Sequence, residues 1–321
     1  MEWVFPAFIV AMIASFGATK WVLNELQRRA ILDLPNQRSS HDRPTPRGGG
    51  IAVIVIVLLC WLYPAFNSPI MATMVIGATA LAVLSWFDDL HSLGIAIRLG
   101  AQFFAAVIGL AFLQHEGLLL QGLAPEWLDR AVTVLAWVWF VNLFNFMDGI
   151  DGIAAVETII VAGGLAVLAL IVPARAPDIW FPLSLIAATL GFLWWNWHPA
   201  KLFLGDVGSV PLGFLLGGLL ILTAMKGAWL AALILPLYFL ADATLTLFLR
   251  ALKREPVWQA HRQHCYQQAV QNGKSHAAVS IAVGLIGLVL ICLGAFSIYQ
   301  PVLSFAGATA LVAGLMVWMV R

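Results

Sequence analysis

The feature that most constrains this chain is a series of long apolar runs, each of a length that suits a lipid bilayer. A membrane-spanning helix needs about 20 apolar residues, with a range of about 17–25. The runs are continuous rather than alternating, so they predict helices and not the strands of a barrel. The sequence contains eleven candidate spans: 3–23, 48–66, 70–87, 97–113, 131–147, 153–172, 179–196, 210–225, 228–248, 279–298 and 301–320.

The composition excludes several other classes of protein. Hydrophobic residues make up 62% of the 321 residues and charged residues 10%, against about 25% charged residues in soluble domains. A soluble domain, a disordered chain and a basic nucleic-acid-binding protein are therefore excluded. Three widely spaced cysteines make neither a disulfide framework nor a zinc ribbon. We predict a single all-α, polytopic domain over residues 1–321, embedded in the lipid bilayer, with no nucleic-acid partner.

Lysine and arginine predict the direction in which the chain enters the membrane. If the N-terminus lies outside, 14 of the 17 basic residues fall in inner segments, and Arg130, Arg175 and Lys226 fall in outer ones. Positive charge favours the cytoplasmic side. We therefore expect a periplasmic N-terminus and, with an odd number of spans, a cytoplasmic C-terminus. We expect no cleaved signal peptide, because no positive charge precedes the first full-length run.

Five polar loops with unusual chemistry all fall on the predicted inner face: 24–50, 88–98, 142–152, 196–209 and 249–278. A transporter of an anionic metabolite, which is an alternative reading, would place its polar groups near the middle of the membrane. Glu157 and Asp242 come close to that position, and their roles are open. The gathering of polar groups at one surface favours chemistry between a cytoplasmic compound and a lipid headgroup.

Acidic residues recur in these loops. Asp88 and Asp89 end the third span, either as a polar stop or as a functional pair. Asn142, Asn145 and Asp148 are spaced by three residues and share a helix face, followed by the turn-forming residues Gly149, Asp151 and Gly152. The asparagines alone could serve helix–helix hydrogen bonding. Asp206, between Gly205 and Gly208, suits a cation ligand or a helix cap. Oxygen ligands favour Mg²⁺ or Mn²⁺ over zinc.

Basic residues lie in the same inner loops. His261, Arg262 and His264 form a compact set that suits phosphate, or an interfacial helix on anionic lipid. Arg47 stands before three glycines and a helix start, a pattern that suits an anion, although topology alone also demands basic residues there. Acids for a divalent cation and bases for phosphate therefore meet beside apolar helices. The pattern predicts phosphate chemistry at the membrane surface.

The ordered motifs resemble those of the polyprenyl-phosphate N-acetylhexosamine-1-phosphate transferase family, glycosyltransferase family 4, which includes WecA-, WbpL- and MraY-type enzymes. The resemblance covers about residues 36–268. It rests on Pro44-Thr-Pro-Arg-Gly-Gly49, Asp88-Asp89, Asn142-x-x-Asn145-x-x-Asp148-Gly-x-Asp151-Gly, Pro199-Ala-Lys-x-Phe-Leu-Gly-Asp206-x-Gly-Ser209 and the late histidine motif.

This resemblance implies transfer of sugar-1-phosphate from a UDP-N-acetyl sugar to undecaprenyl phosphate in a bacterial inner membrane, with release of UMP and initiation of O-antigen or a related polysaccharide. It implies that Asp206 binds Mg²⁺, that Asp88 keeps the lipid phosphate ionised and that Asp89 assists. A homodimer is possible, and direct attack is favoured over an aspartyl-phosphate intermediate. The resemblance places the following residues in catalysis or at the donor: Arg47, Asn145, Asp148, Gly149, Asp151, Lys201, His261, Arg262 and His264.

One motif departs from the family pattern, and this bears on the donor. Relatives of the WecA and MraY types often carry His-x-His-His, whereas this chain reads His264-Cys-Tyr266-Gln267. The difference favours a WbpL-like enzyme that uses UDP-GlcNAc, UDP-FucNAc or UDP-QuiNAc over an MraY-type phospho-MurNAc-pentapeptide transferase. We expect Tyr266 and Gln267 to contact the donor sugar. A CDP-alcohol phosphatidyltransferase is disfavoured, because no Ala-Arg follows the Asp-Gly pairs.

Overall fold

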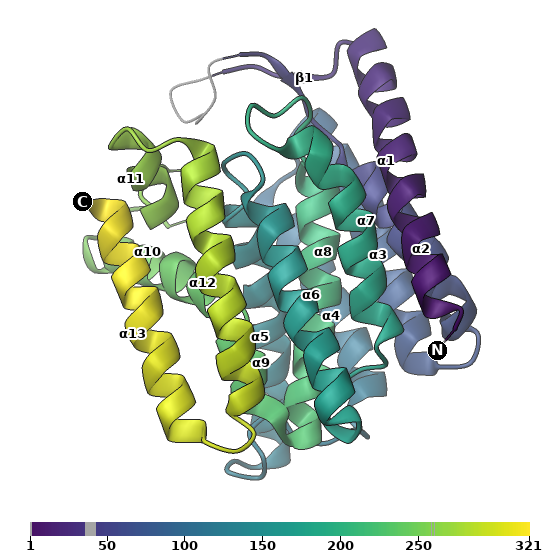
Figure 1. Ribbon diagram of the computed structural model, residues 1–321, viewed down its shortest axis with the longest axis vertical. Coiled ribbons are helices and arrows are strands. Elements are labelled where there is room, and N and C mark those ends of the chain that lie inside the picture. The colour runs from purple at the N-terminus through teal and green to yellow at the C-terminus, as the bar shows by residue number, and fades with distance from the viewer. Residues whose placement is uncertain (1, 36–42, 258, 260) are drawn as a thin grey trace.

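The computed structural model describes residues 2–35, 43–257, 259 and 261–321. These residues form a helical bundle with a short two-stranded sheet at one end (Figure 1). The helices are α1 Val4–Arg28, α2 Gly50–Ala65, α3 Pro69–His91, α4 Ile95–Leu113, α5 Glu126–Phe146, α6 Ile153–Ile171, α7 Trp180–Asn196, α8 Asp206–Thr223, α9 Trp229–Ile234, α10 Leu237–Leu252, α11 Cys265–Gln271, α12 His276–Phe296 and α13 Pro301–Val320. Short 3₁₀ and π segments are η1 Pro173–Arg175 and η2 Ala224–Ala228, and the strands are β1 Leu32–Asp33 and β2 Thr45–Pro46.

The predicted all-α membrane architecture is confirmed, because each predicted span overlaps helix. Within the described residues, eight helical segments are long and apolar enough to cross a membrane, with α8, η2 and α9 counted as one segment. The helices α2, α7 and α10 have 16, 17 and 16 residues and are shorter. The chain ends lie toward opposite ends of the bundle in Figure 1. The number of crossings and the orientation in the membrane remain predictions.

The ninth predicted span, 228–248, is wrong as a single helix. The structure divides it into α9 and α10, with Leu235 and Pro236 between them. Proline has no backbone N–H to donate, so the helical hydrogen-bond ladder is interrupted at Pro236, whose own backbone (φ −94°, ψ 20°) departs from helical geometry. A hydropathy pattern cannot detect the break, because both pieces are apolar.

Helix α8 lies at the centre of the bundle and packs mainly against α3 and α5. All of its residues from Val207 to Thr223 are buried. Large apolar side chains on the outer helices, such as Phe5, Phe104 and Val302, are instead exposed. Helix α8 thus begins at a polar residue and is buried along its length, while the helices around it expose apolar side chains. This arrangement is expected for a bundle surrounded by lipid tails.

Close backbone contact brings the start of α2 to the start of α8. The N–H groups of Gly48 and Gly49 donate to the carbonyl of Phe203, and Gly50 donates to Leu204, at 3.2, 2.8 and 2.8 Å. A Cβ on Gly50 would lie 2.2 Å from Cα of Gly208, so no side chain fits there. These glycines therefore allow α2 to approach α8 closely, and this places Arg47, the residue before them, beside the first turn of α8.

Candidate active site

The centre of the site is the N-terminus of α8, which is capped by the last turn of α3. The carboxylate of Asp89 accepts hydrogen bonds from the backbone N–H groups of Asp206 and Val207, at 3.3 and 3.1 Å. The Asp89 side chain is 3% exposed. A carboxylate is favourable at a helix N-terminus, because it satisfies free N–H groups and meets the positive end of the helix dipole. Asp89 thereby holds Asp206 beside the end of α3.

Arg47 joins the two acids. Its Nη2 lies 2.5 Å from Oδ1 of Asp206 and 2.9 Å from Oδ1 of Asp89. Burial of the guanidinium acts to lower the pKa of Arg47, but the charges of Asp206 and Asp89 outweigh it, and the pKa is raised. The predicted grouping of Arg47, Asp89 and Asp206 is therefore present, and it depends on the glycine contacts described above.

Asp88, the residue before Asp89, makes a separate set of contacts. Its carboxylate accepts the N–H of Leu93 at 2.6 Å and a hydrogen bond from Nη1 of Arg98 at 3.0 Å. The same Nη1 lies 3.9 Å from Oδ2 of Asp206. Sequence reasoning did not select Arg98 as a site residue. The available signal was a basic residue in the first turn of an apolar helix directly after the Asp pair.

The end of α5 completes the cluster. Oδ1 of Asn145 accepts a hydrogen bond from the hydroxyl of Ser209 at 2.6 Å, which ties α5 to α8. Asp148 follows in the turn after α5. Its pKa is raised well above the ordinary value, because burial and the nearby charges of Asp206, Asp89 and Asp151 outweigh the charge of Arg47. The excess of carboxylates is a physical reason for a cation at this site.

These residues fit a bound Mg²⁺ or Mn²⁺ better than zinc. Asp206 and Asp89 place two carboxylates on one side of Arg47, and Asp148 adds a third whose ionisation is disfavoured by burial and then by the neighbouring carboxylates. All three offer oxygen atoms, the ligands that these hard cations prefer. Asp206, with Asp89 and Asp148, would hold the ion.

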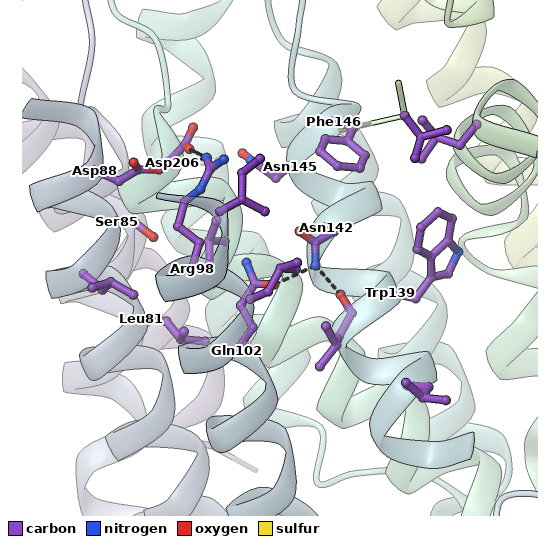
Figure 2. Close-up of a pocket in the computed structure, with 18 of the residues that line it drawn as sticks. Leu81, Ser85, Asp88, Arg98, Gln102, Trp139, Asn142, Asn145, Phe146 and Asp206 are labelled. Atoms are coloured by element: carbon purple, nitrogen blue, oxygen red, sulfur yellow. Dashed lines mark hydrogen bonds and ion pairs between the residues drawn. The ribbon is translucent and has the colours of Figure 1, made fainter. Parts of the chain in front are cut away.

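An apolar cavity of about 530 Å³ opens next to this cluster. Figure 2 shows Asp88, Arg98, Asp206 and Asn145 together at one end, and Leu81, Gln102 and Trp139 further along it. The cavity lies between α3, α4, α5, α8 and α10, and its other lining residues include Leu84, Leu99, Leu135, Val138, Val210 and Leu247. It can hold a molecule with an apolar body and an anionic end.

Asp151 lies in the turn before α6 with its carboxylate directed at two histidines. Its Oδ2 is 2.7 Å from Nδ1 of His198 and 3.3 Å from Nδ1 of His276, and it accepts the N–H of Ala200 at 3.1 Å. Burial acts to raise the pKa of Asp151, but the hydrogen bonds from His276 and His198 outweigh it and the pKa is lowered. Sequence reasoning selected neither histidine.

The late histidine motif surrounds α11. His264 is 2% exposed, stacks on Tyr266 with ring centroids 5.8 Å apart, and has Nδ1 3.5 Å from Oδ1 of Asp242. His261 lies next to it, with ring centroids 4.7 Å apart. Gln271 donates its side-chain amide to the carbonyl of Arg262 at 2.8 Å. The donor contacts predicted for these side chains remain predictions.

The expectation that Tyr266 contacts the sugar is wrong for this structure. Tyr266 is fully buried, and its hydroxyl donates to the carbonyl of Phe146 at 2.9 Å. Gln267 is 8% exposed and accepts the N–H of His264 at 3.3 Å. Both side chains therefore hold the loop to the end of α5 and to itself. Lys201 is exposed, with Nζ 5.5 Å from the ring centroid of Trp195, and its donor contact also remains a prediction.

The fold and the site define a polytopic membrane protein with a carboxylate–guanidinium centre at one end of an apolar cavity, and comparison with known proteins identifies its family. The family model "Glycosyl transferase family 4" matches residues 71–224. A probable undecaprenyl-phosphate N-acetylglucosaminyl 1-phosphate transferase of Bacillus subtilis (strain 168) is 30% identical over 293 residues, 88% of this chain and 82% of that protein.

Two further relatives differ in the substrates that their names give. A decaprenyl-phosphate N-acetylglucosaminephosphotransferase of Mycolicibacterium smegmatis is 26% identical over 345 residues, 95% of this chain and 84% of that protein. A phospho-N-acetylmuramoyl-pentapeptide-transferase of Frankia alni is 30% identical over 262 residues, 66% of this chain and 74% of that protein. The chain belongs to glycosyl transferase family 4, as the motifs predicted.

Proposed function

We propose that this chain transfers N-acetylhexosamine-1-phosphate from a UDP-sugar to undecaprenyl phosphate and releases UMP, as the first step of a surface polysaccharide such as O-antigen. The observation that carries the proposal is the apolar cavity that ends at Asp88, Arg98 and Asp206 in a member of this family. UDP-GlcNAc is the favoured donor, because the relatives with the widest coverage are named for N-acetylglucosamine. UDP-FucNAc and UDP-QuiNAc are the alternatives.

The cavity suits the lipid acceptor. Its walls are mostly apolar, and burial of isoprenoid carbons there is favoured by about 0.8 kcal/mol for each CH₂ removed from water. Arg98, at the polar end, supplies a guanidinium for the lipid phosphate, which it can bind through two parallel hydrogen bonds. The prenyl chain of the lipid would lie along α5 and α8, and the lipid phosphate would point toward Asp88 and Asp206.

The proposed chemistry is direct displacement. An oxygen of the lipid phosphate attacks the phosphorus that carries the sugar, a new P–O bond forms, and the bridging oxygen leaves with UMP. Asp88 keeps the lipid phosphate deprotonated, while Arg47 and Arg98 offset the negative charge of two approaching phosphates. Mg²⁺ bound by Asp206, Asp89 and Asp148 would neutralise charge on the diphosphate and on the leaving UMP.

The donor would lie on the other side of the acidic cluster, toward the turn 148–152 and α11. Gly149 faces Tyr266 closely, since a Cβ there would lie 2.1 Å from the Tyr266 hydroxyl oxygen. The segment that leads into α11 contains His261, Arg262 and His264. We propose that these side chains, together with Lys201, contact the diphosphate and the sugar. The protein is proposed to act in the inner membrane with this face cytoplasmic.

A transporter is the less favoured alternative. The mid-span acids do not line the large cavity. Asp242 instead accepts hydrogen bonds from Tyr238, Thr246 and the backbone of α11, and Glu157 is buried in α6. Side chains that pass an anionic substrate would be expected at a cavity near the middle of the membrane.

The test is release of UMP by purified protein in detergent that contains Mg²⁺, UDP-GlcNAc and undecaprenyl phosphate. Asp206→Asn and Asp88→Asn should each reduce the rate by about 100-fold or more, because both remove charge from the reacting centre. Asp88→Asn should also change the pH profile of the remaining activity. Asp178→Asn, an exposed residue near η1, is the matched control and should retain the wild-type rate. Near-wild-type rates for both site variants would contradict the mechanism.

The orientation has a separate test in intact cells that express a cysteine-free version. A cysteine at Gln121 should react with an impermeant reagent, whereas a cysteine at Gln271 should react only after the membrane is opened. The reverse pattern would place the acidic cluster outside the cell and would contradict a cytoplasmic donor.

A further inference from the structure

The side chains of Asp151, His198 and His276 form a cluster. Neither histidine has a role in the proposed transfer reaction. The three residues come from separate parts of the chain: the turn before α6, the loop before α8 and the first residue of α12. Their ligand atoms, a carboxylate oxygen and two ring nitrogens, all lie within 4.8 Å of one another. Among the described residues, Asp151, His198 and His276 form the one group of at least three His, Cys, Asp or Glu side chains whose ligand atoms lie this close together.

The distances suit a small tetrahedral ion. Oδ2 of Asp151 is 2.7 Å from Nδ1 of His198 and 3.3 Å from Nδ1 of His276. Zinc binds imidazole nitrogen and carboxylate oxygen at 2.0–2.2 Å, so two of its ligand atoms in a tetrahedral site are about 3.3 Å apart. Small side-chain movements would therefore bring the three atoms into the first coordination sphere of one ion.

Nδ1 of His276 lies between two groups of Asp151. It is 3.3 Å from the backbone nitrogen of Asp151 and 3.3 Å from the Asp151 carboxylate. A metal requires the neutral ring with its lone pair on this nitrogen. An ion bound there would take the place of the direct contact between the imidazole and the carboxylate.

The cluster is also accessible from one side. The side chain of His198 is 38% exposed, whereas those of Asp151 and His276 are 7% and 9% exposed. An ion can enter past His198, and water can take the remaining position. The carboxylate is already held by the N–H of Ala200 at 3.1 Å, which orients it as second-sphere contacts orient ligands in known metal sites.

We propose that Asp151, His198 and His276 bind a zinc ion, at a site that shares no ligand with the magnesium site at Asp206. Two imidazoles and one carboxylate are a donor set that zinc uses and that Mg²⁺ does not favour. The ion would fasten the loop that leads to α8 onto the starts of α6 and α12. This inference rests on the geometry of the three side chains and not on the proposed transfer reaction.

The test measures zinc retained by tag-free protein that has been treated with a chelator, exposed to zinc and passed over a gel-filtration column. The wild type should retain about one zinc ion per chain, and a large excess of Mg²⁺ should not displace it. His198→Ala and His276→Ala should abolish retention. His198→Asn is a second variant, because its amide can still donate to Asp151 but cannot replace the imidazole as a zinc ligand.

Two controls locate the site. His115→Ala, an exposed residue at the other end of the molecule, should retain zinc as the wild type does. His261→Ala tests the neighbouring histidine pair and should also retain it. Cobalt should give the intense visible absorption of a tetrahedral site in the wild type and not in His198→Asn. The proposal is overturned if the wild type retains no zinc, if both His198 variants retain it, or if His261→Ala alone loses it.

Discussion

The carboxylate of Asp242 accepts the backbone N–H of Cys265 at 2.9 Å and so fixes the start of α11 to the middle of α10. The other oxygen accepts the N–H of Tyr266 at 3.3 Å, and the hydroxyls of Tyr238 and Thr246 complete the shell at 3.0 and 3.2 Å. Asp242 is fully buried. The same environment raises the pKa of the Cys265 thiol to about 12, through burial and then the charge of Asp242.

The first prediction is that Asp242→Asn destabilises the protein and weakens donor binding. An amide places an NH₂ group near backbone donors, so at least one N–H loses its acceptor at a cost of about 1–3 kcal/mol. The apparent unfolding temperature in detergent should fall, and KM for the UDP-sugar should rise more than KM for the lipid phosphate.

Asp129 provides the matched control for Asp242. It is 1% exposed and accepts the N–H groups of Leu119 and Leu120, at 3.1 and 2.6 Å, near the other end of the bundle. Asp129→Asn should lower the unfolding temperature by a similar amount without changing the ratio of the two KM values. Equal effects of both variants on that ratio would show that Asp242 acts on stability alone.

The second prediction concerns the contact between Gly149 and Tyr266. A Cβ on residue 149 would lie 2.1 Å from the Tyr266 hydroxyl oxygen and 3.0 Å from Cζ. Gly149→Ala should therefore destabilise the fold by about 1–3 kcal/mol through overpacking. Tyr266→Phe removes the oxygen that clashes, although it also removes the hydrogen bond to Phe146.

A double-mutant cycle separates these effects. Tyr266→Phe should cost about 0.5–1.5 kcal/mol alone, for the lost hydrogen bond. The double variant should be more stable than the sum of the two single changes predicts, because the clash and the hydrogen bond involve the same oxygen atom. Additive changes in the free energy of unfolding would mean that the two residues do not meet as the structure shows.

How much of the site the sequence predicts depends on where each residue lies along its helix. Asp89, Asn145 and Asp206 are at helix ends on one face of the membrane, so topology alone predicts that they gather. The pairing of Arg98 with Asp88, and of His276 with Asp151, depends on which helices pack together, and a single sequence does not contain that information. The sequence places Tyr266 at the sugar, because an aromatic hydroxyl in a polar loop gives no sign of its own burial.

The third prediction concerns pH and Asp148. The folded structure raises the pKa of Asp148, so its protonated form is favoured in the folded state relative to the unfolded chain. Its contribution to stability is then largest below the unfolded pKa of about 3.9 and is lost as pH rises toward the folded pKa. Asp148→Asn should be more stable than the wild type at neutral pH, and this difference should shrink as pH falls toward the unfolded pKa of about 3.9 and change no further below it.

The measurement is the apparent unfolding temperature against pH, in detergent with EDTA so that no cation screens the carboxylates. Glu2→Gln, an exposed residue that precedes α1, is the control and should follow the wild-type curve. A variant that is less stable than the wild type at neutral pH, with the difference growing as pH rises, would contradict the charge crowding around Asp148.

The last prediction concerns the length of the lipid acceptor. Trp139 lines the 530 Å³ cavity and also a second apolar cavity of about 270 Å³ toward the other end of the bundle. Its indole N–H donates to the hydroxyl of Thr244 at 3.1 Å, which holds the ring between α5 and α10. Trp229 lines the second cavity but not the first. A long prenyl chain would therefore pass Trp139 before it reaches Trp229.

This order gives a pattern that can be measured with polyprenyl phosphates of increasing length. Trp139→Ala should leave KM for the shortest acceptor unchanged and raise KM for intermediate and long acceptors, by roughly tenfold if contacts worth one or two buried CH₂ groups are lost. Trp229→Ala should raise KM for the longest acceptors alone. If Trp139→Ala raises KM equally for every chain length, the prenyl chain does not run from the first cavity to the second, and Trp139 acts instead on the polar end of the acceptor.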